Sequence, residues 1–246
     1  MAMRLGHLLF TLGCLALLIL RWIKRRGSWR QDLGFGPHPR KVQDFLMGCL
    51  FGTLAMFFVF GIEWLCGWLH PGPFNRAGWA GLDILPPLMF MALWEEFRFR
   101  GIELSGLRTI MPPWGALVLS SVVFGAAHCL NANASGLSIL GNMLGGFVYG
   151  YAFLASGAIW LSFGLHAAWN MVQGPILGLP ISGYLEGGLW NPTVSGPESL
   201  TGGNYGPEAG LVGLAAHILT LALLWAYHRK QRPEFTGEPT PKELPC

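Results

Sequence analysis

The chain has 246 residues, of which 52% are hydrophobic and only 12% are charged. Its mean hydropathy is positive, and so few charges cannot cover the surface of an ordinary soluble domain. The formal net charge of +3 is small and the basic residues cluster beside hydrophobic segments, which argues against a nucleic-acid partner. The composition predicts a polytopic protein in contact with the lipid bilayer.

The first hydrophobic segment covers residues 7–20 and is followed at once by a basic cluster. A cleaved signal peptide has its charges before the apolar region and small residues after it, so this reversed order predicts a retained span. If the segment only lies on the membrane surface, the rest of the topology is unchanged. The cluster consists of Arg21, Lys24, Arg25, Arg26 and Arg30.

Six further spans are expected along the chain. The third starts near residue 82 and continues as an amphipathic helix to Arg108, where Pro112 and Pro113 prevent further helix because proline lacks the backbone donor. The glycines of the fifth span stand four apart, a spacing that lets helices approach closely, and they are Gly141, Gly145, Gly146 and Gly150. The other spans cover residues 45–69, 114–130, 137–154, 159–179 and 211–227.

The loop charges support seven spans. If the segment after the first span is cytoplasmic, fourteen of the sixteen Lys and Arg residues lie on that side or at its border. This arrangement places the amino terminus and the Gly/Pro-rich connection 180–209 outside, and the carboxyl terminus inside. We therefore predict an all-α membrane bundle of about seven transmembrane helices. Residues 1–41 form the first segment and basic loop, 42–228 the embedded core and 229–246 a mobile cytoplasmic tail.

The five cysteines show no paired metal-binding spacing, and four of them fall within predicted spans. Small apolar packing residues are the favoured interpretation, ahead of a disulfide framework or a zinc site. They are Cys14, Cys49, Cys66, Cys129 and Cys246.

Three short motifs place polar side chains on hydrophobic helices. Carboxylates, imidazoles and amides at such depth are costly unless they are paired or functional. In each motif a spacing of four residues puts two side chains on one face of a helix, one turn apart. The motifs are Glu95-Glu96 with Arg100, Phe124 with His128, and His166 with Asn170.

The two adjacent glutamates are predicted to differ in role. Glu96 can pair with Arg100 one turn later, whereas Glu95 points about 100 degrees away and is the freer carboxylate. Glu95 is therefore the candidate general base. Counted from the span ends, Glu95 and His128 lie at similar depth, and Asn170 can reach the same level.

Residues outside the motifs receive structural interpretations. A single histidine or asparagine in a span usually bonds one helix to another, and Phe124 is expected to pack and shape the pocket. Arg98 and Arg108 are interpreted as interfacial anchors. Four histidines have no partner at an informative spacing, namely His7, His70, His217 and His228.

Together the three motifs resemble those of the CAAX protease and bacteriocin-processing (CPBP) family of intramembrane endopeptidases. That family includes the type II CAAX prenyl endopeptidases. The resemblance covers about residues 82–179 and extends to the segment LTGGNYGPEA at residues 200–209.

The resemblance implies a role for each motif residue. Glu95 and His128 would activate a water molecule, and His166 with Asn170 would bind the oxyanion of the tetrahedral intermediate. Glu96 and Arg100 would hold the helix and its electrostatics in place. The expected activity is hydrolysis of a peptide bond in a peptide or protein substrate, with prenylated proteins among the candidates and without a cofactor or metal.

Three alternatives stay open. Glu95, His128 and His166 could supply three ligands of a zinc-dependent variant, which ranks second because no HExxH motif is present. A bacteriocin-immunity or peptide-binding membrane protein could retain the motifs without catalysis. A transporter would also place such residues at mid-membrane, but the sequence shows none of the inverted repeats it predicts.

The compact length and the lack of eukaryotic targeting signals favour a prokaryotic plasma membrane. The sequence selects neither a substrate nor an oligomeric state.

Overall fold

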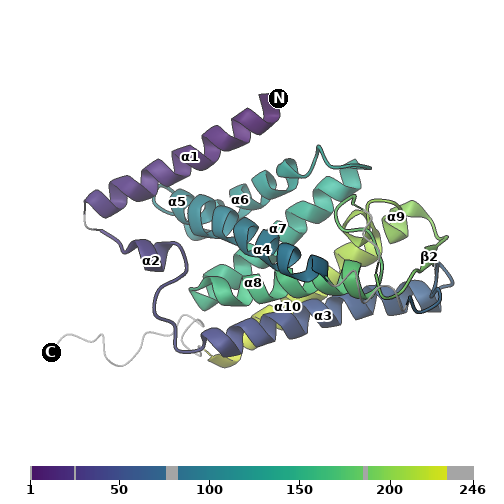
Figure 1. Ribbon diagram of the computed structural model, residues 1–246. Coiled ribbons are helices and arrows are strands. Elements are labelled where there is room, and N and C mark those ends of the chain that lie inside the picture. Colours follow the sequence, from purple (N-terminus) through teal and green to yellow (C-terminus); the bar gives the residue numbers. More distant parts are fainter. Residues whose placement is uncertain (1, 25, 76–82, 185–187, 232–246) are drawn as a thin grey trace.

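The computed structural model describes residues 2–24, 26–75, 83–184 and 188–231, and this part of the chain is almost entirely helical (Figure 1). The two short strands are β1 (Leu69–His70) and β2 (Thr193–Val194), which pair in antiparallel register. The helices are α1 (Ala2–Ile23), α2 (Trp29–Asp32), α3 (Lys41–Leu65), α4 (Leu85–Glu96), η2 (Phe97–Leu104), α5 (Ser105–Leu107), α6 (Pro113–Ala127), α7 (Gly136–Ser156), α8 (Ile159–Met171), η3 (Val172–Ile176), α9 (Glu198–Thr201), η4 (Pro207–Ala209) and α10 (Leu211–Gln231).

The all-α membrane bundle is confirmed, whereas the count of seven spans is not. Four described helices are long and apolar enough to cross a membrane, namely Leu5–Ile23, Lys41–Leu65, Gly136–Ser156 and Leu211–Lys230. The other three predicted spans are shorter or change helix type. Helix α6 is short, α4 passes into η2, and α8 passes into η3, which contains Pro175.

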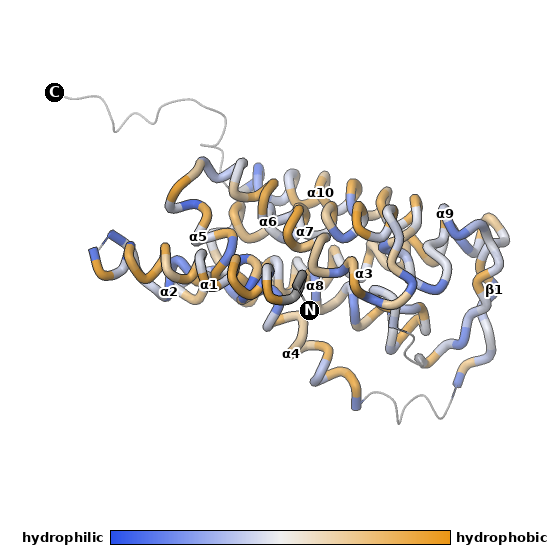
Figure 2. The backbone as a smooth tube through the Cα atoms, turned by 90° about the horizontal axis from the view of Figure 1, so that it is seen from above, coloured by the Kyte–Doolittle hydropathy of each residue, from blue (hydrophilic) through white to orange (hydrophobic). Residues whose placement is uncertain are grey.

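Large apolar side chains are exposed along the outer helices, as expected for a surface in contact with lipid. On α1 they include Leu5, Leu9 and Leu12, each at least half exposed. Figure 2 shows hydrophobic residues running along α1 and α10. Because water would disfavour so much exposed apolar area, this pattern supports a membrane environment.

The third predicted helix changes to π-helical geometry directly after the two glutamates. The helix predicted to run to Arg108 is continuous as far as Leu107, but it is π-helical over η2, Phe97–Leu104. In a π-helix residues five apart are bonded, and two side-chain contacts use that spacing. Arg98 Nε lies 3.4 Å from Glu103 Oε1, and Ser105 Oγ donates to Arg100 O at 3.2 Å. The wider π-helical turn therefore lets Arg98 reach the buried carboxylate of Glu103, and Ser105 reach the backbone carbonyl of Arg100.

The most extensive helix contact joins α3 to α8, and it depends on glycine. A Cβ on Gly48 would collide with the carbonyl oxygen of Leu161, and a Cβ on Gly164 would collide with that of Phe45. A larger side chain at either position would meet backbone atoms that cannot rotate away. These glycines hold α8, which carries His166, against α3.

The glycine spacing predicted for α7 does mark close contacts, on two different faces. Gly146 and Gly150 face Phe124 and Leu117 of α6, and a Cβ on Gly146 would lie only 3.0 Å from Phe124 Cβ. Gly145 faces α10, and Gly141 faces the backbone of η4. Helix α7 is thus the central helix against which α6, η4 and α10 are set.

Helix α1 lies on the outside of the bundle, with only 11% of its apolar window buried. Its anchor is Glu103, whose side chain is fully buried and whose Oε1 accepts from Thr11 Oγ1 at 2.6 Å and from His7 Nε2 at 3.2 Å. His7, for which the sequence shows no partner at an informative spacing, is thus bonded to a distant residue. The partner lies 96 positions away, beyond the reach of a spacing argument.

The start of α3 and the end of α10 meet at one end of the bundle, where Tyr227 Oη donates to Asp44 Oδ1 at 2.8 Å (Figure 1). Helix α2, which carries Arg30 of the basic cluster, lies toward the same end, whereas Arg25 lies outside the described residues (Figure 1). Helix α10 continues to Gln231, so residues 229–231, predicted to begin the mobile tail, are helical. The rest of that tail, Cys246 included, and Arg76 lie outside the described residues.

Candidate active site

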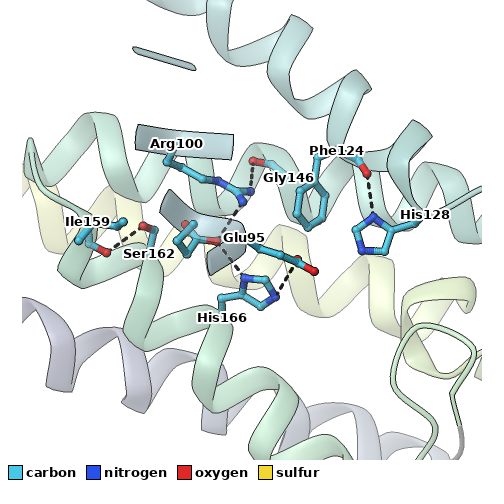
Figure 3. Close-up of polar contacts among 9 residues, drawn as sticks. Glu95, Arg100, Phe124, His128, Gly146, Ile159, Ser162 and His166 are labelled. Carbon is cyan, nitrogen blue, oxygen red and sulfur yellow. Dashed lines mark hydrogen bonds and ion pairs between the residues drawn. The ribbon is translucent and has the colours of Figure 1, made fainter. Parts of the chain in front are cut away.

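Glu96 is fully buried and joins three helical elements. Its Oε1 accepts from Arg100 Nη1 at 2.9 Å and from His166 Nδ1 at 2.9 Å (Figure 3). Arg100 Nη2 also donates to Gly146 O of α7 at 3.1 Å, and its guanidinium lies 4.7 Å from the centre of the Phe124 ring. The predicted pairing of Glu96 with Arg100 is therefore confirmed, and the pair connects the helix of the glutamates to α7 and α8.

Glu95 is the freer of the two carboxylates, as the spacing predicted, and it lines the cavity. Its side chain is 26% exposed, and its Oε2 lies 3.8 Å from His166 Nε2. Figure 3 shows the Glu95 carboxylate between the imidazole rings of His166 and His128. A separation of 3.8 Å is an ion-pair distance rather than a hydrogen bond, so the carboxylate can still accept a bond from a water molecule.

His128 ends α6 with its ring in a fixed orientation. Its Nδ1 lies 2.8 Å from the carbonyl oxygen of Phe124, and its ring centre lies 4.7 Å from that of Phe124. A carbonyl can only accept, so Nδ1 carries a proton and Nε2 keeps its lone pair in the neutral imidazole. Phe124 thus does more than fill space, because its carbonyl selects the tautomer of His128.

His166 is held on α8 by a carboxylate and an aromatic ring. Its Nδ1 donates to Glu96, while the ring stacks on Tyr149 at 4.6 Å between centres and 10° between planes. This leaves Nε2 directed at Glu95. Asn170 follows one turn later on α8, at the wall of the same cavity, and is partly exposed.

All four predicted catalytic residues line one cavity of about 350 Å³. Glu95 comes from α4, His128 from the end of α6, and His166 with Asn170 from α8, so the predicted meeting of three helices at one void is confirmed. Helices α7 and α10 and the connection before α10 complete the wall. Its further polar residues are Arg98, Asn131, Asn142, Tyr149, Ser182, Glu208 and His217.

Arg98 lines this cavity, a position that its interpretation as an interfacial anchor did not predict. Its Nε donates to Thr11 Oγ1 at 3.3 Å and lies 3.4 Å from Glu103 Oε1. The cavity wall therefore includes a cation that also contacts α1 through Thr11. The π-helical spacing that joins Arg98 to Glu103 could not be read from an α-helical pattern.

His217 and Glu208 are two further cavity residues to which the motifs assign no role. His217 Nδ1 donates to Gly213 O at 3.1 Å, and the ring stacks on Trp169 with 4.2 Å between centres. Glu208 belongs to the LTGGNYGPEA segment, whose resemblance to the family was the available signal. Its Oε2 accepts from Gln173 Nε2 at 2.9 Å.

Glu208 is only 5% exposed, and burial raises the pKa of its carboxyl group from 4.5 to about 7. The folded chain therefore keeps a proton between these pH values that the unfolded chain has released. The contribution of Glu208 to the free energy of unfolding is fully present below pH 4.5 and is lost as the pH rises to 7. The loss amounts to about 3 kcal/mol, because each pKa unit corresponds to about 1.4 kcal/mol.

This loss should be absent when the carboxyl group is removed. In detergent at about pH 4.5, we expect Glu208→Gln and the wild type to have similar melting temperatures. At about pH 8, the melting temperature of Glu208→Gln should be clearly higher than that of the wild type. Tyr205, whose pKa is raised to about 12 chiefly by burial, stays protonated across this range. Parallel dependences of the two melting temperatures on pH would contradict the assignment.

The donor geometry bears on the zinc alternative. Within residues 2–24, 26–75, 83–184 and 188–231, no three His, Cys, Asp or Glu side chains converge closely enough to hold a metal ion. The set Glu95, His128 and His166 shares a cavity without forming such a group.

Comparison with known families identifies the matching part of the chain. Residues 77–172 match a family model described as type II CAAX prenyl endopeptidase Rce1-like. This segment holds Glu95, His128, His166 and Asn170, so the resemblance inferred from the three motifs is confirmed. The match implies intramembrane CAAX protease activity and, with the four apolar helices, a membrane protein. No curated protein and no solved structure matches the chain.

Proposed function

We propose, from the match to the type II CAAX prenyl endopeptidase model, that this chain is an intramembrane endopeptidase that uses a water molecule activated by Glu95 and His128. The observation that supports this most is that both side chains border the cavity that His166 and Asn170 also border. The substrate is a peptide or protein, prenylated or not, and the enzyme resides in a prokaryotic plasma membrane.

Attack begins with a water molecule between Glu95 and His128. The Glu95 carboxylate takes one proton while the water oxygen bonds to the carbonyl carbon of the peptide. His128 Nε2 accepts a hydrogen bond from the other O–H group of the water, and that hydrogen stays on the attacking oxygen. Nε2 can accept because the bond from Nδ1 to Phe124 O leaves it with a lone pair. The two groups thus orient and activate the nucleophile together.

The carbonyl oxygen becomes negatively charged and needs donors placed in advance. His166 supplies Nε2–H in its protonated form, which the Glu96 carboxylate at Nδ1 stabilises. The Asn170 amide supplies a second donor from one turn further along α8. When the carbon–nitrogen bond breaks, the proton held by Glu95 passes to the leaving amine, which restores the carboxylate and leaves a new carboxyl terminus.

Removing the amide donor should slow the chemical step. Asn170→Ala is expected to lower kcat by about 10²–10³, the usual cost of losing one oxyanion donor, with little change in KM. Asn204→Ala, at an exposed position of the connection before α10, is the matched control and should retain wild-type kcat. An Asn170→Ala enzyme with a raised KM and an unchanged kcat would instead place Asn170 in ground-state binding.

Activity is expected to persist in a metal chelator, because the proposed steps need only side chains of this chain. The measurement compares cleavage rates of the purified protein with and without chelator, and after added zinc. Loss of activity in chelator followed by recovery with zinc would favour the zinc-dependent alternative.

The direct test incubates the purified, detergent-solubilised protein with a panel of farnesylated and unmodified peptides and follows products by mass spectrometry. Peptides that bind without being cut would favour the peptide-binding or immunity alternative. Products that appear with the wild type and vanish with Glu95→Ala and His128→Ala would support the proposed mechanism.

A further inference from the structure

The wall of the cavity formed by α7, α10 and η4 holds a carboxylate that the proposed reaction does not use. Glu208 sits in η4, directly before α10, where its backbone presses on Gly141 of α7 so closely that any side chain there would collide with Glu208 O. Its side chain borders the cavity while remaining 5% exposed. The carboxylate is therefore directed inward by a tightly fixed turn.

The hydrogen-bond partners of Glu208 are all neutral groups. Gln173 Nε2 donates to Oε2 at 2.9 Å, and Ser182 Oγ lies 3.3 Å from Oε1. The backbone N–H groups of Glu208 and Ser182 also donate to this carboxyl group, so hydrogen bonds stabilise it but no positive charge does. In the part of the chain that the structure describes, no ion pair joins Glu208 to a lysine, arginine or histidine.

Two neighbouring cavity residues also present acceptors. Both N–H donors of Asn142 are engaged, with Ser138 O and Tyr205 Oη, each at 2.8 Å, so its Oδ1 is the atom left for a ligand. His217 donates from Nδ1 to Gly213 O, which leaves the Nε2 lone pair on the edge nearest Gly145. A carboxylate, an amide oxygen and an imidazole nitrogen thus line one side of the cavity.

The two arginines near the cavity are already paired. Arg98 contacts Glu103, and Arg100 is bound to Glu96 and Gly146 behind the cavity wall. A site rich in acceptors and short of donors suits a group with several N–H donors and a positive charge, because both hydrogen bonding and charge are then complementary.

We propose that Glu208, Asn142 and His217 form a substrate subsite that takes the ammonium or guanidinium group of a basic residue in the peptide. This assignment rests on the proposed endopeptidase function and adds a specificity to it. The raised pKa of Glu208, about 7, agrees with an anion that has no cation beside it until a ligand supplies one.

The test is a cleavage profile that needs no known substrate. A mixed library of peptides, acetylated at the amino terminus so that only side chains carry cations, is incubated with the full-length protein in detergent. Mass spectrometry then reports the residues around each cut. We expect lysine and arginine to exceed glutamine at one fixed position by at least about tenfold, as the removal of one partner of a desolvated charge pair predicts.

Variants are compared through this ratio within each enzyme, so a general loss of rate does not affect the result. Glu208→Gln keeps the shape of the side chain and should bring the ratio close to one, whereas Glu208→Asp should retain a preference. Glu198→Gln, which removes an exposed carboxylate of α9, is the matched control and should keep the full ratio. An unchanged ratio in Glu208→Gln, or no basic preference in the wild type, would overturn the subsite. A preference for free over acetylated amino termini would assign the site to the α-amine instead and overturn the proposed side-chain specificity.

A binding measurement separates this inference from the function on which it rests. Acetylated, amidated tripeptides with a central lysine or glutamine are added to the wild type and to Glu208→Gln, and melting temperatures are recorded. Lysine-specific stabilisation of the wild type alone supports the subsite even if no peptide is cut. Equal stabilisation of the wild type by the two tripeptides overturns the subsite. This comparison uses the wild type alone, so it decides the question even if Glu208→Gln does not fold.

Discussion

Replacing Glu95 by glutamine is expected to lower kcat by about 10²–10⁴, the range that general-base catalysis contributes. Glutamine has nearly the same shape but cannot take the proton of the attacking water or return it to the leaving amine. The side chain is 26% exposed at the cavity and lies 3.8 Å from His166 Nε2, without a bond to Arg100, so folding should depend little on its charge. The measurement is the initial rate of peptide cleavage at saturating substrate.

Glu198→Gln removes an exposed carboxylate that does not line the cavity and is the matched control for the loss of one charge. The melting temperature of Glu95→Gln should stay close to that of the wild type, which separates lost chemistry from lost structure. Wild-type kcat in a folded Glu95→Gln protein would remove Glu95 from the role of base.

Replacing Arg100 by methionine should destabilise the fold by about 3–5 kcal/mol, because it leaves Glu96 as a buried carboxylate without its guanidinium partner. Glu96 is fully buried and Arg100 is 2% exposed, so water cannot compensate. The loss of the bond from Arg100 to Gly146 O also releases the contact with α7. The measurement is the concentration of a denaturing detergent at which the helices unfold.

The double variant Glu96→Gln with Arg100→Met tests the cause. Removing both charges leaves no uncompensated ion, so the double variant should be more stable than Arg100→Met alone. Its cleavage rate should nevertheless stay low, because His166 loses the carboxylate at Nδ1. Unfolding of Arg100→Met at the wild-type detergent concentration would contradict a structural role for the pair.

The sequence predicted the helices and the motif geometry well because both follow from local periodicity. The starts of α8 and α10 coincide with the predicted starts at residues 159 and 211. The pairing of Glu96 with Arg100 needs only the rise and turn of one helix. The shared cavity of Glu95, His128 and Asn170 followed from depth, since antiparallel spans bring equal depths together.

What the sequence did not predict depends on contacts between distant segments or on irregular backbone. The partners of His7 and Arg98 lie on η2, whose π-helical turn has no simple sequence signal. His217 enters the cavity because Gly145 leaves room for its ring. Glu208 is carried in by a Gly-rich connection whose path no periodicity describes.

The count of seven spans is not confirmed, for a related reason. Hydropathy marks α4, α6 and α8 as apolar, but it does not reveal that α4 and α8 give way to π-helical segments near the site. Such irregular backbone is tolerated within a membrane where protein or a cavity surrounds it. The helices that depart most from a regular span are therefore those that carry Glu95, His166 and Asn170.

The most direct test follows the oxygen of the water. Single-turnover cleavage of a peptide in heavy-oxygen water, followed by mass spectrometry, should place one heavy oxygen in the new carboxyl terminus and none in Glu95. Glu95→Gln should yield no labelled product in the same time. Peptides left intact by the wild type, or heavy oxygen found in the Glu95 carboxylate after one turnover, would contradict direct attack by an activated water molecule.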